Sequence, residues 1–249
     1  MGSRMRARLG QHMMVSRKWL RTMADLLEVS GYDEVVELGA GTGNLSEEIL
    51  LRGPKKLILV ERDARLVEVL RSRFRGKGNV EVIRGDIRNF LPIRTDKIAS
   101  NPPYYLSSQL VLGLARSRFR RAVVTFQREF AERLVAKPGT ERYGSLSVIA
   151  SLLLNVRLVA TVGRGAFSPP PAVESAILVI EPREDELRDQ ILRYCRLIFS
   201  RRKRELKNVL RPFVGERALS SPHHDLRPYH LTPEQVREVI AWLGEELGR

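Results

Sequence analysis

The sequence predicts an α/β fold in which a parallel sheet is covered on both faces by helices and is followed by a small helical domain. Between residues 34 and 126, short apolar runs alternate with stretches of helical period. This alternation is typical of parallel strands joined by helices. The acidic segment 181–186 then precedes a stretch that is helical in pattern and rich in arginine. We therefore expect one domain of residues 1–182 and a second of residues 183–249.

Hydrophobic periodicity assigns the individual elements. The first helix is expected over 16–29, where Trp19, Met23 and Leu27 recur at helical spacing and Gly31 marks the end. The expected strands are the short apolar runs at 34–38, 57–60, 80–83, 97–100, 121–126, 156–162 and 176–181. The other expected helices are at 44–51, 64–74, 107–115, 131–135, 146–154 and 191–211.

Length and composition set the class of protein. With 249 residues, of which 43% are hydrophobic, the chain can form one full core and a small second domain. No apolar run reaches about 18 residues, and the basic segment 1–8 lacks the apolar centre of a signal peptide. Cys195 is the single cysteine, which excludes an internal disulfide and fits a reducing environment. We expect a cytoplasmic protein with no membrane partner.

The charge balance predicts a polyanionic partner. Lys and Arg together number 43 against 29 Asp and Glu, which gives a formal net charge of +14. Such an excess favours nucleic acid or an anionic membrane surface as the partner. Arginine, which outnumbers lysine, suits bidentate contacts with phosphate. A coding bias or the surface of a thermophilic protein would explain part of this excess without any partner.

A glycine turn, Gly39-Ala40-Gly41-Thr42-Gly43, follows the first expected strand and opens a helix. Glycines such as Gly39 and Gly41 allow the backbone to approach a ligand and direct N–H groups toward it. Asn44 replaces the glycine at the sixth position of a dinucleotide fingerprint, and Glu37 precedes the first glycine by two residues. Both features favour the amino-acid end of S-adenosylmethionine over a pyrophosphate as the ligand. A different nucleotide or an ordinary turn remains the alternative.

Carboxylates end the next two expected strands. Glu61 ends the second strand, where it can accept hydrogen bonds from both hydroxyls of a ribose. Asp86 ends the third, where it can accept from the amino group of the cofactor's adenine, while the Ile87 N–H meets the ring. Since the carboxyl ends of parallel strands meet in one crevice, we expect these residues to converge with Glu37. A solvated Glu61 beside Arg62 is the alternative.

The fourth expected strand runs into Asn101-Pro102-Pro103-Tyr104. The two prolines fix φ and remove two N–H donors, so the strand ends there in a rigid elbow. The Oδ1 atom of Asn101 and the Pro102 carbonyl can both accept hydrogen bonds from the N6 amino group of an adenine, and Tyr104 can stack on that base. The alternative is a Pro-Pro turn in which Asn101 caps the next helix.

The chain carries a series of motifs in a fixed order. They are Gly10-Gln11-His12, Glu37-Leu38-Gly39-Ala40-Gly41-Thr42-Gly43, Gly85-Asp86, Asn101-Pro102-Pro103-Tyr104, Tyr143-Gly144-Ser145-Leu146-Ser147-Val148, Phe167-Ser168-Pro169-Pro170-Pro171-Ala172-Val173, Phe199-Ser200-Arg201-Arg202-Lys203 and Leu231-Thr232-Pro233-Glu234. Over residues 9–240 this order resembles the ribosomal RNA adenine-N6 dimethyltransferase family. Met13-Met14, where the family has Phe-Leu, and Tyr105 are small departures. The resemblance implies a Rossmann-like class I methyltransferase sheet of seven strands with a small all-helical C-terminal domain.

The resemblance also implies roles for individual residues. Those that it places against S-adenosylmethionine are His12, Met14, Gly39, Glu61, Asp86 and Asn101. Glu37, Gly41 and Ile87 complete the predicted cofactor site, and Asn101, Pro102 and Tyr104 form the predicted catalytic elbow. By the same resemblance, Phe167 stacks on the target base opposite Tyr104. Methyl transfer from a sulfonium to N6 needs positioning and charge stabilisation rather than a strong base, so we expect neither a metal ion nor a catalytic histidine.

A basic stretch near the C-terminus is expected to bind RNA. If residues 191–211 form one helix, its basic residues lie within an arc of roughly 100° beside an apolar arc. The basic arc consists of Arg193, Arg196, Lys203, Arg204, Lys207 and Arg211. The predicted RNA-binding residues are Arg193, Arg196, Arg201, Lys203, Arg204 and Lys207. A solvated charged face is the alternative.

The resemblance implies dimethylation of two adjacent adenosines in the 3′-terminal hairpin of small-subunit rRNA, on an assembling small ribosomal subunit. We expect a monomer that uses S-adenosylmethionine. One alternative is the related large-subunit dimethyltransferase of the antibiotic-resistance type, and another is a non-catalytic RNA-binding assembly or transcription factor on the same fold. Arg227-Pro228 and Leu231-Thr232-Pro233 favour the small-subunit branch. The intact cofactor positions oppose a loss of activity.

Overall fold

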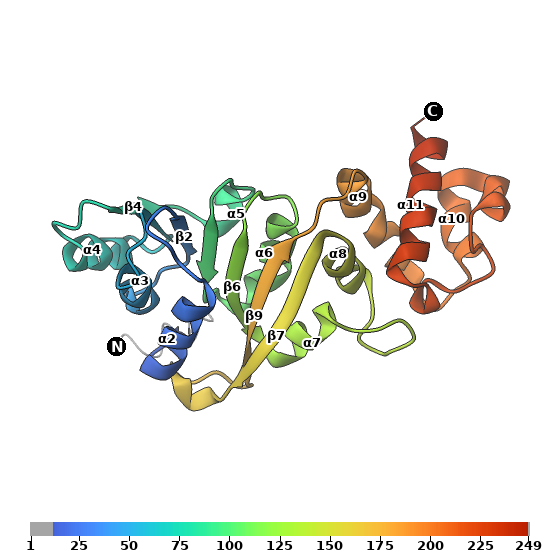
Figure 1. Cartoon of the computed structure of the whole chain (residues 1–249). Coiled ribbons are helices and arrows are strands. Elements are labelled where there is room, and N and C mark those ends of the chain that lie inside the picture. Colours follow the sequence, from blue (N-terminus) through green and yellow to red (C-terminus); the bar gives the residue numbers. More distant parts are fainter. Residues whose placement is uncertain (1–11, 249) are drawn as a thin grey trace. The chain divides into compact units, whose positions relative to one another are not determined.

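A seven-stranded sheet forms the centre of the first part of the chain in the computed structural model, which describes residues 12–248 (Figure 1). Its strands lie in the order β4-β3-β2-β5-β6-β9-β7. The strands are β2 (Glu34–Leu38), β3 (Lys56–Glu61), β4 (Val80–Arg84), β5 (Lys97–Ser100), β6 (Arg121–Gln127), β7 (Leu154–Val162) and β9 (Ser175–Pro182). Every expected strand is therefore present, with slightly shifted ends, and the predicted α/β class is confirmed.

One strand of the sheet runs against its neighbour. The strands β2 to β6 pair in parallel, whereas β9 pairs antiparallel with β6. Between β7 and β9 the chain forms the 3₁₀ turn η2 (Arg164–Ala166) and the short strand β8 (Phe167–Ser168) but no α-helix. Since β7 and β9 are neighbours in the sheet, this connection joins adjacent strands without a helix. The sequence did not indicate this reversal.

The order of the strands reverses beside β2. From β2 the chain adds β3 and β4 on one side and then returns to place β5 and β6 on the other. In open α/β sheets the ligand crevice forms at such a reversal, outside the carboxyl ends of the strands. The loops that begin at Gly39 and Asn101 follow β2 and β5 and therefore meet at this point.

The described residues divide into two compact units. The first comprises the described residues up to Ala131 together with Arg157–Pro182. Its helices are α2 (Arg17–Leu26), α3 (Asn44–Leu50), α4 (Ala64–Arg73), α5 (Ile87–Phe90) and α6 (Ser107–Leu114), and α7 (Arg128–Leu134) begins within it.

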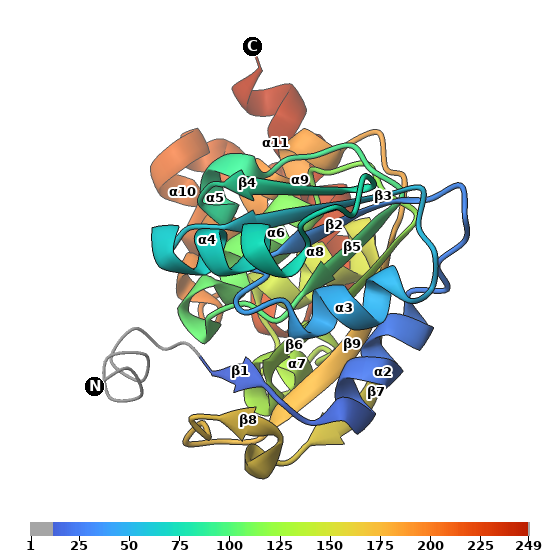
Figure 2. The same ribbon diagram turned by 90° about the vertical axis from the view of Figure 1, so that its left-hand side faces the viewer.

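One face of the sheet is buried beneath α2 and α3, which lie side by side in Figure 2. Alternate strand residues, such as Val35 and Leu57, point to this face because side chains alternate along a strand. They join Met23 of α2 and Ile49 of α3 in one buried cluster. The short strand β1 (Met13–Met14) pairs antiparallel with β8 apart from the main sheet (Figure 2).

The second unit comprises Glu132–Val156 and the described residues from Arg183 onward. Its helices are α8 (Ser145–Leu153), α9 (Arg188–Ile198), α10 (Leu206–Val214) and α11 (Pro233–Leu247), with 3₁₀ turns η3 (Phe199–Arg201), η4 (Gly215–Ser220) and η5 (Pro228–His230). Residues 132–156 thus belong to the helical unit, whereas the predicted first domain, 1–182, includes them. The domain boundary near residue 182 stays a prediction. Between residues 12 and 248, no helix is long and apolar enough to cross a membrane.

The expected single helix over 191–211 is wrong. The helix α9 ends at Ile198, and α10 begins only at Leu206. Between them the Arg202 carbonyl accepts a hydrogen bond from the Tyr229 N–H at 3.1 Å, and the Leu206 N–H donates to the Leu226 carbonyl at 2.8 Å. These bonds to a distant loop replace helical bonds, so tertiary contacts interrupt a sequence of helical period. The predicted basic arc therefore does not exist as one helix face.

A capping box begins the last helix, α11. The Thr232 Oγ1 atom accepts from the Gln235 N–H at 3.2 Å, and the Gln235 Oε1 atom accepts from the Thr232 N–H at 2.9 Å. We expect Thr232→Ala to lower the free energy of unfolding by about 1 kcal/mol, because the Gln235 N–H loses the side-chain oxygen that accepts its hydrogen bond. Thr232→Ser keeps the hydroxyl and should retain most of the stability in urea titrations. Equal losses in both variants would contradict a capping role.

Candidate functional site

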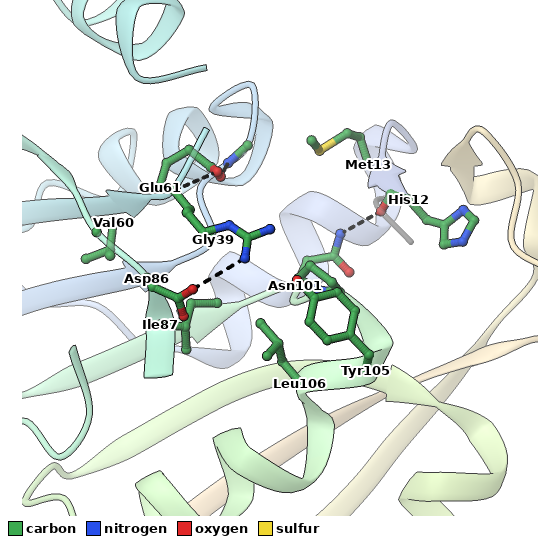
Figure 3. Close-up of a pocket in the computed structure, with 14 residues that line it drawn as sticks. His12, Met13, Gly39, Val60, Glu61, Asp86, Ile87, Asn101, Tyr105 and Leu106 are labelled. Atoms are coloured by element: carbon green, nitrogen blue, oxygen red, sulfur yellow. Dashed lines mark hydrogen bonds and ion pairs between the residues drawn. The ribbon is translucent and has the colours of Figure 1, made fainter. Parts of the chain in front are cut away.

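A pocket opens at the carboxyl ends of β2, β3, β4 and β5 (Figure 3). It contains seven of the residues predicted for the cofactor site, which are His12, Gly39, Gly41, Glu61, Asp86, Ile87 and Asn101. Met14 and Glu37, the remaining two, line a smaller pocket that shares Gly39 and Asn101 with the first. The structure thus brings together residues from four loops and the N-terminal segment.

The glycine turn after β2 needs glycine for its backbone and for space. Gly39 has φ 79° and Gly41 has φ 59°, which lie in the left-handed region that side chains disfavour. A Cβ on Gly41 would lie 2.7 Å from Sδ of Met13. The turn therefore passes close to the N-terminal segment and leaves its backbone open to the pocket.

Glu61 is buried, and its carboxylate is held by backbone N–H groups. Oε2 accepts from the Gly41 N–H at 2.9 Å, and Oε1 accepts from the N–H groups of Arg62 at 2.8 Å and Asp63 at 2.9 Å. These bonds join the turn after β2 to the turn after β3. A carboxylate offers about four acceptor positions, so one position remains for a ligand.

Asp86 begins the short helix α5 and is held by arginines. Oδ1 accepts from the backbone N–H of Arg88 at 2.9 Å, and the Arg88 guanidinium forms two further bonds to the carboxylate. Nη1 of Arg62 lies 3.4 Å from Oδ2, which is the dashed line at Asp86 in Figure 3. The hydrogen bonds from Arg88 hold the pKa of Asp86 below its usual range, so the group is ionised.

The elbow after β5 is braced on both sides. The Asn101 amide donates from Nδ2 to the His12 carbonyl at 3.1 Å and accepts at Oδ1 from the Thr125 hydroxyl. Pro102 is buried. The Tyr104 hydroxyl lies 2.6 Å from the Ser175 Oγ atom, and its ring stacks on His12 with 5.7 Å between centroids. Because a carbonyl oxygen has two lone pairs, Asn101 Oδ1 retains one acceptor position.

The structure does not present Phe167 to a base. Its side chain is only 3% exposed and belongs to the buried cluster of the first unit. The antiparallel register that pairs Phe167 with Met14 turns both side chains inward. The aromatic residue that does line the pocket is Tyr105, which follows Tyr104 in the sequence and is 56% exposed. In the sequence, Tyr105 stands out only as a departure from the family pattern.

Other pocket residues also went unrecognised. The unrecognised lining residues are Met13, Val60, Arg62, Gly85, Pro103, Tyr105 and Leu106. Arg62 and Leu106 each lie within two residues of a predicted site residue, and this nearness was the only sign in the sequence that they line the pocket. Nothing in the sequence indicated which side chain of each loop points inward.

The predicted RNA-binding residues differ in their partners. Arg193, Arg196, Arg201, Lys203 and Arg204 are exposed in the second unit. Lys207 is instead paired with Glu205 at 3.2 Å and Asp225 at 2.7 Å. Arg211 pairs with Glu216. Carboxylates therefore already neutralise Lys207 of this set and Arg211 of the predicted basic arc.

Solved structures place the fold among the class I methyltransferases. A dimethyladenosine transferase from Plasmodium falciparum superimposes with a TM-score of 0.81 and 26% identity, covering 94% of this chain and 98% of that one. The 23S rRNA methyltransferase ErmE has a TM-score of 0.69 and 23% identity, covering 95% of this chain and 100% of that one. This second likeness shows the fold alone.

Sequence relatives define the family. A protein named probable ribosomal RNA small subunit methyltransferase A from Pyrococcus abyssi is 36% identical over 98% of this chain and 94% of its own length. The protein of the same name from Methanopyrus kandleri is 37% identical over 99% of this chain and 95% of its own length. The family model described as ribosomal RNA adenine dimethylase matches residues 2–239. The chain belongs to the ribosomal RNA adenine dimethylase family, as the motifs indicated.

Burial favours the neutral form of the Glu37 side chain. It is 2% exposed, and burial raises its pKa to about 8, with a smaller contribution from Glu61, against the hydrogen bond from the Ser46 hydroxyl. In the unfolded chain a glutamate releases its proton near pH 4.5. The folded state therefore holds one more proton between these values, and the stability due to this group falls as pH rises through that window.

We expect Glu37→Gln, which mimics the protonated acid, to remove this contribution. The free energy of unfolding of the variant relative to wild type should increase from pH 5 to pH 8 by up to about 1.4 kcal/mol per pH unit. Urea titrations at several pH values measure the difference. Glu47→Gln, an exposed glutamate on α3, controls for the loss of one negative charge. Parallel pH curves for wild type and Glu37→Gln would contradict the prediction.

Proposed function

We propose that this chain transfers methyl groups from S-adenosylmethionine to N6 of two adjacent adenosines in the 3′-terminal hairpin of small-subunit rRNA, giving N6,N6-dimethyladenosine during ribosome assembly. The observation that carries the proposal is the Asn-Pro-Pro-Tyr elbow at the rim of a pocket with two carboxylates, in a chain of the ribosomal RNA adenine dimethylase family. The names of the relatives support the small subunit as the substrate.

The chemistry of the pocket fits S-adenosylmethionine. Glu61 and Asp86 offer carboxylate acceptors at neighbouring strand ends, for the ribose and the adenine amino group respectively. The glycine turn leaves room and backbone N–H groups for the amino-acid end. Val60, Ile87 and Leu106 give apolar surface for the flat ring. When bound, the cofactor supplies a methyl group on a positively charged sulfur.

The elbow residues act on the target amine. The N6 lone pair of adenine is delocalised into the ring, which makes it a weak nucleophile. Hydrogen bonds accepted by Asn101 Oδ1 and the Pro102 carbonyl favour a tetrahedral nitrogen whose lone pair faces the methyl group. The N–C bond forms as the S–C bond breaks, and the cationic nitrogen then loses its proton to water. In this proposal no metal ion takes part.

Tyr104 supplies the stacking surface for the base in this proposal. Its ring lies on the same elbow as Asn101 and is held by the contact with Ser175. The burial of Phe167 gives no support to its role as the second stacking ring.

We also propose that the protein acts as a monomer in the cytoplasm.

The test of this function is transfer of labelled methyl groups to isolated small ribosomal subunits that lack the modification, with the product mapped by base. We expect dimethylation of two adjacent adenosines near the 3′ end of the RNA. Large-subunit RNA is the second substrate in the assay. Transfer only to the large-subunit RNA would replace the proposal by the resistance-type alternative. Absence of transfer to either, with subunit binding retained, would favour a non-catalytic factor.

Asn101→Ala should impair methyl transfer more than binding. The variant loses an acceptor whose hydrogen bond strengthens as N6 becomes positive, so we expect a loss of about 3 kcal/mol, roughly a hundredfold in rate. Single-turnover transfer at saturating cofactor and subunit measures this step. Asn44→Ala is a matched control, because the Asn44 amide likewise donates to an N-terminal carbonyl, that of Met14, at 3.0 Å. Wild-type rates in Asn101→Ala would contradict the mechanism.

The exposed cations of the second unit should carry the contacts with RNA phosphates. We expect Arg201→Ala/Lys203→Ala to weaken RNA binding and to lower the slope of log K against log salt by about 1–2. Lys207→Ala/Arg211→Ala removes the same charge but takes away cations already paired with acids, so its effect should be smaller. Filter binding over a salt series measures both slopes. Identical slopes for the two double variants would show that the salt dependence of RNA binding reflects only the net charge of the protein and not contacts made by Arg201 and Lys203.

A further inference from the structure

Arg62 occupies the part of the pocket between the ends of β3 and β4. It follows Glu61 at the end of β3 and lines the pocket. Its Nη1 atom lies 3.4 Å from Oδ2 of Asp86, which follows the neighbouring strand β4. The side chain is 52% exposed, whereas that of Asp86 is 14% exposed. A largely exposed cation therefore contacts the group that the proposed function assigns to the adenine.

The acceptor positions of Asp86 are already filled. A carboxylate offers about four. Oδ1 accepts from the backbone N–H and the Nε of Arg88, and Oδ2 accepts from Nη2 of Arg88 and Nη1 of Arg62. The amino group of an adenine can bond to this carboxylate only after one of these donors leaves.

Arg62 is the donor that can leave most easily. Arg88 contacts Asp86 at 2.9, 3.0 and 2.8 Å, through a guanidinium fork and through the backbone N–H at the start of α5. Arg62 makes a single contact at 3.4 Å from an exposed side chain. A single long contact is weaker than a fork of short ones. Cofactor binding should therefore displace Arg62 and leave Arg88 in place.

We propose that Arg62 is a positioning residue that competes with the adenine of the cofactor for Asp86 and so lowers the affinity for S-adenosylmethionine. This inference rests on the proposed function, which puts the adenine at Asp86. Binding breaks the ion pair, and the guanidinium turns into solvent. Exposed ion pairs change an equilibrium constant by up to about fivefold, which sets the size of the effect.

The experiment compares wild type, Arg62→Met and Arg65→Met by calorimetry with S-adenosylmethionine and S-adenosylhomocysteine. Arg65 is the matched control, because it lies three residues further on at the start of α4, is 72% exposed and pairs with Asp63 at 2.8 Å. We expect Arg62→Met to bind both ligands about two- to fivefold more tightly and Arg65→Met to match wild type. Higher salt should tighten the binding of S-adenosylhomocysteine, which has no net charge, to wild type but not to Arg62→Met. In turnover assays the change should fall on the KM for the cofactor.

Several results would overturn the inference. Unchanged or weaker binding to a folded Arg62→Met protein would exclude competition. A gain confined to S-adenosylmethionine would indicate repulsion between Arg62 and the sulfonium, because both ligands carry the same adenine. A gain that persists in the Asp86→Asn background would show that Arg62 does not act through Asp86. If wild type bound neither ligand, the proposed function would fall as well, whereas the other results leave it intact.

Discussion

The geometry of the pocket depends on the hydrogen bonds that the Glu61 carboxylate accepts. It accepts hydrogen bonds from the N–H groups of Gly41, Arg62 and Asp63, and it is buried while doing so. Two turns that follow different strands are thereby fixed to one side chain. A buried carboxylate needs several donors, and these three N–H groups supply them. The ribose acceptor of the proposed site is therefore set in place before any ligand arrives.

Two asparagines perform a similar task for the N-terminal segment. Asn44 at the start of α3 donates to the Met14 carbonyl at 3.0 Å, and Asn101 donates to the His12 carbonyl at 3.1 Å. The backbone of residues 12–14 is thus held across the switch point of the sheet, beside the glycine turn. This explains why Gly41 must lack a side chain, since a Cβ would meet Met13 there. At Asn101 an amide suits this task because Nδ2 donates to the segment while Oδ1 retains an acceptor position, which we propose for the substrate.

The sequence predicted the strands, and it predicted that the residues at their ends converge on one pocket, because both features follow from local patterns. Short apolar runs fix the strands, and residues directly after them, such as Glu61 and Asp86, must lie at the crevice of a parallel sheet. The sequence did not predict those features of the structure that depend on contacts between residues far apart in the chain. The 191–211 helix breaks because loop groups near Leu226 and Tyr229 bond to its backbone. Phe167 is buried because of its strand register with Met14, which no local pattern indicates.

Environment, rather than residue type, decides which acids of the site carry charge. Glu37 is enclosed by the strand and α3 with one hydroxyl as its partner, so burial raises its pKa to about 8. Asp86 lies at the surface among guanidinium groups, which hold its pKa low. The charge at the adenine end is therefore maintained by arginines, and these same arginines fill the acceptor positions that a ligand needs. Stabilising an ionised acceptor and keeping it free for a ligand are opposed requirements. The contact of Arg62 with Asp86 serves the first requirement and hinders the second.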